Sequence, residues 1–170
     1  MVKILFIANS PSPNTNDLYR ALNEGSEFEV CVVYTEGHNR KWARPLATVG
    51  YEAVFLSTQK SLRKRVGVLI DLIRSPDIQV VVVQGYCPLT HLYCMLALGS
   101  IKRKPWLFWG ERMRVWPDES LLRRLAKRLV ITLIGRADRI LAIGTAGAAA
   151  YARLGIDEKL LSSVPYARDL

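Results

Sequence analysis

The sequence has no apolar run long enough to span a membrane, since a transmembrane helix needs about 20 consecutive apolar residues. Its first residues, MVKILFIANSPSP, carry one lysine and only a very short apolar stretch. A secretory signal has a longer apolar region and a small-residue cleavage site. We therefore interpret this stretch as a first strand and expect a cytoplasmic protein. At 170 residues, half of them hydrophobic, the chain favours a single domain with a substantial core.

Cysteine and histidine are scarce. The three cysteines, Cys31, Cys87 and Cys94, are an odd number without metal-ligand spacing, which argues against a disulfide framework or a zinc site. We interpret them as small buried thiols. Neither of the two histidines has a suitable nucleophile in view, so no catalytic triad is apparent. We predict no metal site, because no cluster of acidic residues and histidines suggests one.

Two common phosphate-binding motifs are also missing. The sequence contains no G-x-G-x-x-G and no Walker loop with its G-K-[ST], which argues against dinucleotide binding in the usual manner. It also contains no low-complexity tract, linker or internal repeat. We expect no cofactor bound by this chain.

What the sequence does contain is an alternation of apolar runs and helical patterns. The continuous apolar runs are typical of parallel strands buried under helices, and they occupy residues 2–8, 28–35, 51–57, 78–85, 105–110, 138–145 and 160–167. The helical patterns lie between them, at residues 14–25, 61–77, 88–100, 118–138 and 145–155. The pattern predicts an α/β fold, a Rossmann-like doubly wound and mostly parallel sheet of about six or seven strands with helices on both faces. Ligands of such folds bind at the carboxyl ends of the strands.

Polar residues follow the first and fourth of these strands. The loop after the first precedes a helix N-terminus, whose free N–H groups suit phosphate or sugar hydroxyls, and its binding candidates are Asn9, Ser10, Ser12, Asn14 and Asn16. These residues equally suit helix capping, and both roles stay open. After the fourth strand, Gly85 permits a sharp exit, and Gln84 and Tyr86 are placed to face a ligand. We interpret His91, one turn further on, as a packed or solvated residue rather than a catalyst.

The fifth strand delivers the most unusual group of side chains. Trp109 and Gly110 end it, Glu111 follows at the carboxyl edge, and Arg112 and Arg114 lie in the next loop. A carboxylate and two guanidinium groups beside tryptophans suit a sugar or a phosphate. The alternative is an internal salt bridge with the tryptophans in the core. Glu111 is the one catalytic candidate, and catalytic residues are otherwise unknown.

The formal net charge of +9 has two interpretations. It indicates an anionic partner, or it serves only to keep the protein soluble. In one helical pattern Arg123, Arg124, Lys127 and Arg128 recur three and four apart beside a leucine stripe. Such a helix can lie on an anionic membrane surface, which would make the protein peripheral on the inner membrane face. The alternative is a helix that packs its apolar side into the core and leaves its charges in water. Nucleic acid is not favoured, because exposed aromatic residues are not interleaved with the basic clusters.

The last third, RADRILAIGTAGAAAYARLGIDEKLLSSVPYARDL, resembles the end of the N-terminal domain in glycosyltransferase family 4, the retaining enzymes of GT-B fold. The resemblance rests on the pair Ala137-Asp138, on a strand ending at Gly144-Thr145, and on the proline-containing turn at residues 164–169. It places Gly144 and Thr145 among the cleft residues. Two departures stand out: the first loop lacks the glycine pair of many members, and Trp109, Gly110 and Glu111 replace a frequent histidine.

The resemblance implies an enzyme of two domains, of which residues 1–170 form the N-terminal, acceptor-binding one. A C-terminal domain absent from this chain would bind the nucleotide-sugar donor and carry the family's two glutamates with seven residues between them. The acceptor would be a sugar or a lipid-linked sugar at the membrane, and the chain alone would be inactive. The alternative is a complete, non-catalytic Rossmann-like module that binds an anionic ligand, a membrane surface or a partner protein. A homodimer of the chain stays open under either interpretation.

Overall fold

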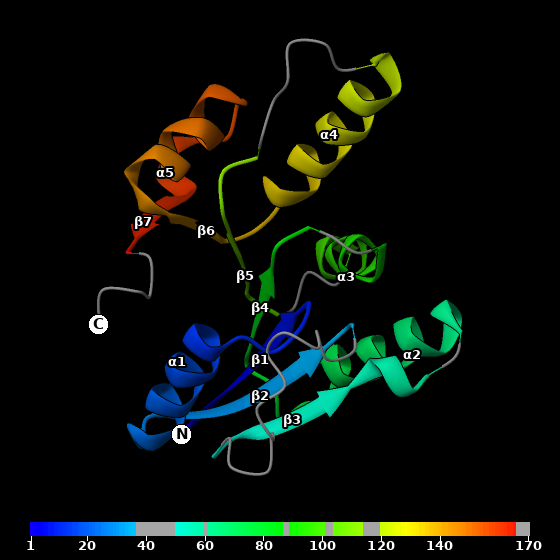
Figure 1. Ribbon diagram of the computed structural model, residues 1–170, viewed down its shortest axis with the longest axis vertical. Coiled ribbons are helices and arrows are strands. Elements are labelled where there is room, and N and C mark those ends of the chain that lie inside the picture. The colour runs from blue at the N-terminus through cyan, green and yellow to red at the C-terminus, as the bar shows by residue number, and fades with distance from the viewer. Residues whose placement is uncertain (37–49, 60, 87–88, 101–103, 114–119, 166–170) are drawn as a thin grey trace.

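The computed structural model describes residues 1–36, 50–59, 61–86, 89–100, 104–113 and 120–165 (Figure 1). Its strands are β1 (Val2–Ala8), β2 (Phe28–Tyr34), β3 (Glu52–Phe55), β4 (Val80–Gln84), β5 (Trp106–Gly110), β6 (Arg139–Ile143) and β7 (Leu161–Val164). Its helices are α1 (Pro13–Glu24), α2 (Leu62–Arg74), α3 (Leu89–Ser100), α4 (Leu121–Ile134) and α5 (Gly144–Arg153). Two short 3₁₀ turns, η3 (Leu56–Thr58) and η4 (Glu158–Leu160), complete the described elements.

The strands form one seven-stranded sheet in the order β3-β2-β1-β4-β5-β6-β7, and every neighbouring pair is parallel. The predicted α/β, Rossmann-like class is therefore confirmed. From β1 the chain moves outward through β2 to β3, and then returns to place β4 on the other side of β1. The reversal between β1 and β4 is the topological switch point, where ligands bind in open sheets of this type.

The two faces of the sheet bury two separate apolar clusters, because successive side chains of a strand point to opposite faces. In β1, Leu5 and Ile7 join one cluster, while Phe6 and Ala8 join the other. Helices α2, α3, α4 and α5 all pack into the first cluster. Among the described helices, only α1 packs into the second, through Tyr19 and its neighbours. The second face is therefore covered mainly over β1 and β2.

Several helices begin at a serine whose hydroxyl accepts a backbone N–H from inside the first turn. Ser12 caps α1 in this way, Ser61 caps α2 and Ser120 caps α4. Such caps satisfy one of the free donors of a helix start. None of the helices that the structure describes is long and apolar enough to cross a bilayer.

Candidate functional site

A cleft of about 430 Å³ opens at the carboxyl ends of β1, β4, β5 and β6. Its lining consists of Asn9, Gln84, Gly85, Tyr86, Trp109, Gly110, Glu111, Arg112 and Ile143. It therefore lies at the switch point between β1 and β4. The structure brings together eight residues that the sequence places at strand ends, and it adds Ile143.

Glycine geometry shapes the wall of this cleft. Gly85 has φ of +80°, a left-handed conformation that turns the chain out of β4. Its N–H donates to the carbonyl of Trp109 at 2.8 Å, so β4 and β5 stay paired up to the cleft. At Gly110 a Cβ atom would lie 2.8 Å from the ring of Phe108, closer than real contacts allow. Both positions therefore favour glycine, one by backbone conformation and the other by space.

Two polar atoms in the wall are buried and have no hydrogen-bond partner among the described residues. They are the Oδ1 acceptor of Asn9 and the Nε1 donor of Trp109. The Trp109 side chain is otherwise core, with 9% of its surface exposed. Leaving such a group unpaired costs about 1–3 kcal/mol, so nearly all buried polar atoms in proteins have partners. Both atoms belong to residues that line the cleft, one as an acceptor and the other as a donor, and a sugar hydroxyl can both donate and accept.

Two buried tyrosines donate hydrogen bonds to residues that line the cleft. The Tyr19 hydroxyl of α1 donates to Oε1 of Gln84 at 2.8 Å, and the Tyr151 hydroxyl of α5 donates to the Glu111 carbonyl at 2.7 Å. Burial raises the pKa of both phenols, so each remains a protonated donor. Sequence reasoning missed both tyrosines, because within a helix each looks like an ordinary core residue.

Glu111 and Arg112 are exposed at the rim. Among ion pairs between described residues, neither side chain takes part in one. The internal salt bridge considered above is thus not formed by these two, and Arg114 lies outside the described residues. Both tryptophans of β5 are buried, Trp106 under the helices of the first face and Trp109 beside the cleft. No three His, Cys, Asp or Glu side chains of the described ranges gather in a way that suits a metal.

The candidate binding residues of the first loop have different roles in the structure. Ser12 caps α1, and its hydroxyl lies 3.4 Å from the Thr15 backbone nitrogen, so the capping role is confirmed for this residue. Oδ1 of Asn16 accepts from the hydroxyls of Tyr34 and Tyr51, at 3.1 and 3.0 Å. The remaining candidates of this loop are Ser10, which is half-buried, and Asn14, which is exposed in the first turn of α1. Of the five, Asn9 lines the cleft.

The last two candidates stand at the end of β6. Gly144 and Thr145 begin α5 directly after Ile143, which itself lines the cleft. Gly144 has φ of +70°, a conformation that glycine adopts without strain, and the Thr145 side chain is exposed. The structure therefore places both residues next to the cleft wall rather than in its lining.

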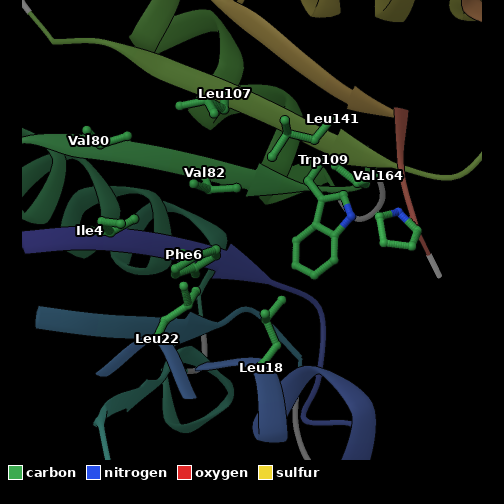
Figure 2. Close-up of a pocket in the computed structure, with 11 residues that line it drawn as sticks. Ile4, Phe6, Leu18, Leu22, Val80, Val82, Leu107, Trp109, Leu141 and Val164 are labelled. Carbon is green, nitrogen blue, oxygen red and sulfur yellow. The ribbon is translucent and has the colours of Figure 1, made fainter. Parts of the chain in front are cut away.

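An apolar groove of about 330 Å³ adjoins the cleft, and Trp109 lines both (Figure 2). The groove runs over the second face of the sheet, where α1 is the only described helix. Its lining is Ile4, Phe6, Leu18, Leu22, Val80, Val82, Leu107, Trp109, Leu141, Val164 and Pro165. A parallel sheet normally has both faces covered, so this groove marks apolar surface that the described helices leave open.

No protein-family profile and no curated protein matches this sequence. Solved structures do match. UDP-GlcNAc 2-epimerase from Neisseria meningitidis, bound to UDP-GlcNAc, is 18% identical with a TM-score of 0.66, over 95% of this chain and 45% of that one. S. aureus MnaA with UDP is 18% identical with a TM-score of 0.66, over 96% and 43%. HepE from Anabaena in complex with UDP is 17% identical with a TM-score of 0.66, over 96% and 44%.

These similarities define the fold of the chain. It spans a little under half the length of the enzymes that it matches. UDP-GlcNAc 2-epimerases share the GT-B fold with glycosyltransferase family 4, so the coarser part of the sequence-based expectation, a Rossmann-like domain of the kind that GT-B proteins contain, is supported. The more specific expectation, a retaining glycosyltransferase, remains a prediction.

Proposed function

We propose that this chain is one half of a GT-B-type enzyme that processes a nucleotide-sugar, and that its cleft holds a sugar. The observation that carries the proposal is the pair of buried, unpartnered polar atoms, Oδ1 of Asn9 and Nε1 of Trp109, at the switch point of the sheet. The similarity to enzymes solved with UDP and UDP-GlcNAc supports the nucleotide-sugar class.

Within this class, the more specific proposal is a retaining glycosyltransferase whose acceptor binds in the cleft. The resemblance of residues 136–170 to glycosyltransferase family 4 supports it. The exposed Glu111 and Arg112 at the rim would hydrogen-bond the hydroxyls of an acceptor sugar, because carboxylate and guanidinium groups form strong charge-assisted hydrogen bonds. The nucleotide-sugar donor would lie mainly on a second domain, so the 170 residues alone would catalyse no transfer.

A second candidate is one half of a nucleotide-sugar epimerase, which the similar structures favour. The two reactions differ in what they consume. An epimerase converts the nucleotide-sugar with no other substrate, whereas a transferase also needs an acceptor. Product analysis with a second domain present, with and without an acceptor sugar, separates them: a new epimer without acceptor would contradict the transferase proposal.

The cleft itself can be tested on the 170-residue chain by NMR of the tryptophan indole N–H groups. The variants Trp109→Phe and Trp106→Phe identify the indole N–H signals of these two residues. Titration with millimolar glucose, N-acetylglucosamine or UDP-GlcNAc should shift the Trp109 signal, because its free donor gains a partner. Trp106 belongs to the cluster on the opposite face of the sheet and serves as the matched control. If Trp109 fails to shift with any of these ligands, or shifts no more than Trp106, the cleft is not the sugar site.

A further inference from the structure

Helix α4 carries two apolar faces, and only one of them is buried. Its C-terminal half packs Val130, Ile131, Leu133 and Ile134 into the first cluster. Its N-terminal part leaves four leucines in solvent: Leu121, Leu122, Leu125 and Leu129 are 72%, 79%, 54% and 58% exposed. The alternative that the leucine stripe packs into the core is therefore wrong for these four residues.

Helical geometry explains why the leucines remain outside. At about 100° per residue, the four leucines fall within an arc of about 100° around the helix axis. The centre of that arc lies about 150° from the centre of the four buried residues. The leucine arc therefore points away from the core. It extends over about the first two and a half turns of α4. Figure 1 shows α4 at the periphery of the molecule, beyond α3.

The charge on α4 is of one sign. The side chains of Arg123, Arg124 and Arg128 are exposed, Lys127 is half-buried, and the helix contains no aspartate or glutamate. Arg124 and Arg128 flank one edge of the leucine arc. A second copy of this chain is a poor occupant for such a surface. A symmetric antiparallel contact would bring Arg124 and Arg128 against their own counterparts in a protein of charge +9.

We propose that the leucine arc of α4 inserts into an anionic lipid surface, with the flanking Arg124 and Arg128 at the headgroups. Leucines on a protruding helix suit a fluid apolar layer, and flanking cations complement phosphate groups. Nucleic acid supplies the anionic groups but no apolar layer to cover four leucines. The surface is distinct from the sugar cleft, so the proposal does not depend on which reaction the cleft serves.

The test is co-sedimentation of the 170-residue chain with vesicles. We expect binding to phosphatidylcholine mixed with phosphatidylglycerol, and much weaker binding to pure phosphatidylcholine or at high salt. Leu122→Ala should weaken binding by about tenfold, because its methyl and methylene groups no longer enter the acyl layer. Arg124→Glu with Arg128→Glu should weaken it by at least about tenfold, because these two arginines flank the leucine arc. These side chains are exposed, so the variants should retain the circular dichroism spectrum of the parent.

Matched controls separate the helix from the general charge. Leu62→Ala removes an exposed leucine from α2, and Arg63→Glu with Lys64→Glu makes the same change in net charge there. Both should leave vesicle binding within about twofold of the parent, since α2 would lie off the lipid surface. The proposal is overturned by absent binding to anionic vesicles at low salt, or by equal losses in controls and α4 variants. A Leu122→Ala variant that splits a dimer would also overturn it, because a second copy would then cover the leucines.

Discussion

At the scale of single residues, the carboxyl end of β5 is the most constrained point of the site. Gly110 is buried, and a Cβ there would meet two atoms of the Phe108 ring at 2.8 Å and the Tyr151 hydroxyl at 3.4 Å. The ring belongs to the packed first cluster, so it has little room to move. The same tyrosine holds the Glu111 carbonyl, which couples core packing to the rim of the cleft.

Gly110→Ala should therefore lower the free energy of unfolding by about 1–3 kcal/mol through overpacking. The matched control is Gly67→Ala, in α2, where a Cβ would meet nothing within 4 Å. That control should raise stability by about 0.5–1 kcal/mol, because alanine favours a helix over glycine. Urea unfolding of both variants checks the pair; equal effects of the two changes would contradict the described packing.

Alkaline pH should destabilise the protein through its buried phenols. Burial raises the pKa of Tyr19 and Tyr151, so each binds its proton more tightly in the folded chain than in the unfolded one. The stability that this provides is fully present below the unfolded pKa of about 10 and is lost as pH rises above it. The melting temperature should fall above that pH, and less steeply in Tyr19→Phe. If the melting temperature of that variant falls with pH as steeply as that of the parent, Tyr19 ionises as freely in the folded chain as in water.

Which side chains meet in the cleft was only partly predictable. A strand end fixes where Gln84, Gly85 and Trp109 emerge, since parallel strands finish at one edge, and the sequence was sufficient to place them. Loop side chains have no such constraint: Asn16 turned to Tyr34 and Tyr51 instead, through contacts between distant segments. Nothing in the sequence around Tyr19 indicates that its hydroxyl donates to Gln84, at the end of β4.

At the scale of elements, hydrophobic patterns located the strands and helices because their periods are set by local geometry. The pattern of α4 revealed a leucine stripe but not which way it faces, since the core-facing side depends on where the helix joins α3. The start of α1 raised a similar ambiguity. Its serines and asparagines suit both capping and ligand binding, and the structure assigns Ser12 to the cap.

Ser12→Ala should cost about 1 kcal/mol of stability, because the first turn of α1 loses the hydroxyl that accepts its backbone N–H. Ligand shifts of the Trp109 indole should persist, since Ser12 is not among the cleft residues. Thermal unfolding together with the NMR titration checks both parts. A variant of full stability that had lost the ligand shifts would instead assign Ser12 to binding.

At the scale of the whole molecule, the second face of the sheet carries an apolar groove that the described helices do not cover. The groove over β4 to β7 is almost wholly apolar, and α1 covers only its edge. The similar enzymes are about twice as long as this chain. We therefore propose that a segment of a second domain covers the groove. No pattern within the 170 residues would reveal such cover, because it would come from outside them.

The 170-residue chain should accordingly bind a hydrophobic dye such as ANS in its folded state, and should self-associate at high concentration. Leu141→Ser, a change in the groove lining, should reduce dye binding, whereas Leu122→Ala in α4 provides a comparison outside the groove. Fluorescence titration and analytical ultracentrifugation measure the two effects. A monomer that binds no dye would mean that the groove is closed in solution by the chain itself.

Reading the coding frame beyond Leu170 tests whether this chain is half of a nucleotide-sugar enzyme. We expect a further domain of strand–helix alternation, of about 150 residues or more. For a retaining transferase, that domain should contain two glutamates with seven residues between them. A stop codon directly after Leu170 would contradict the account, and would favour a complete module that binds its partners without catalysis.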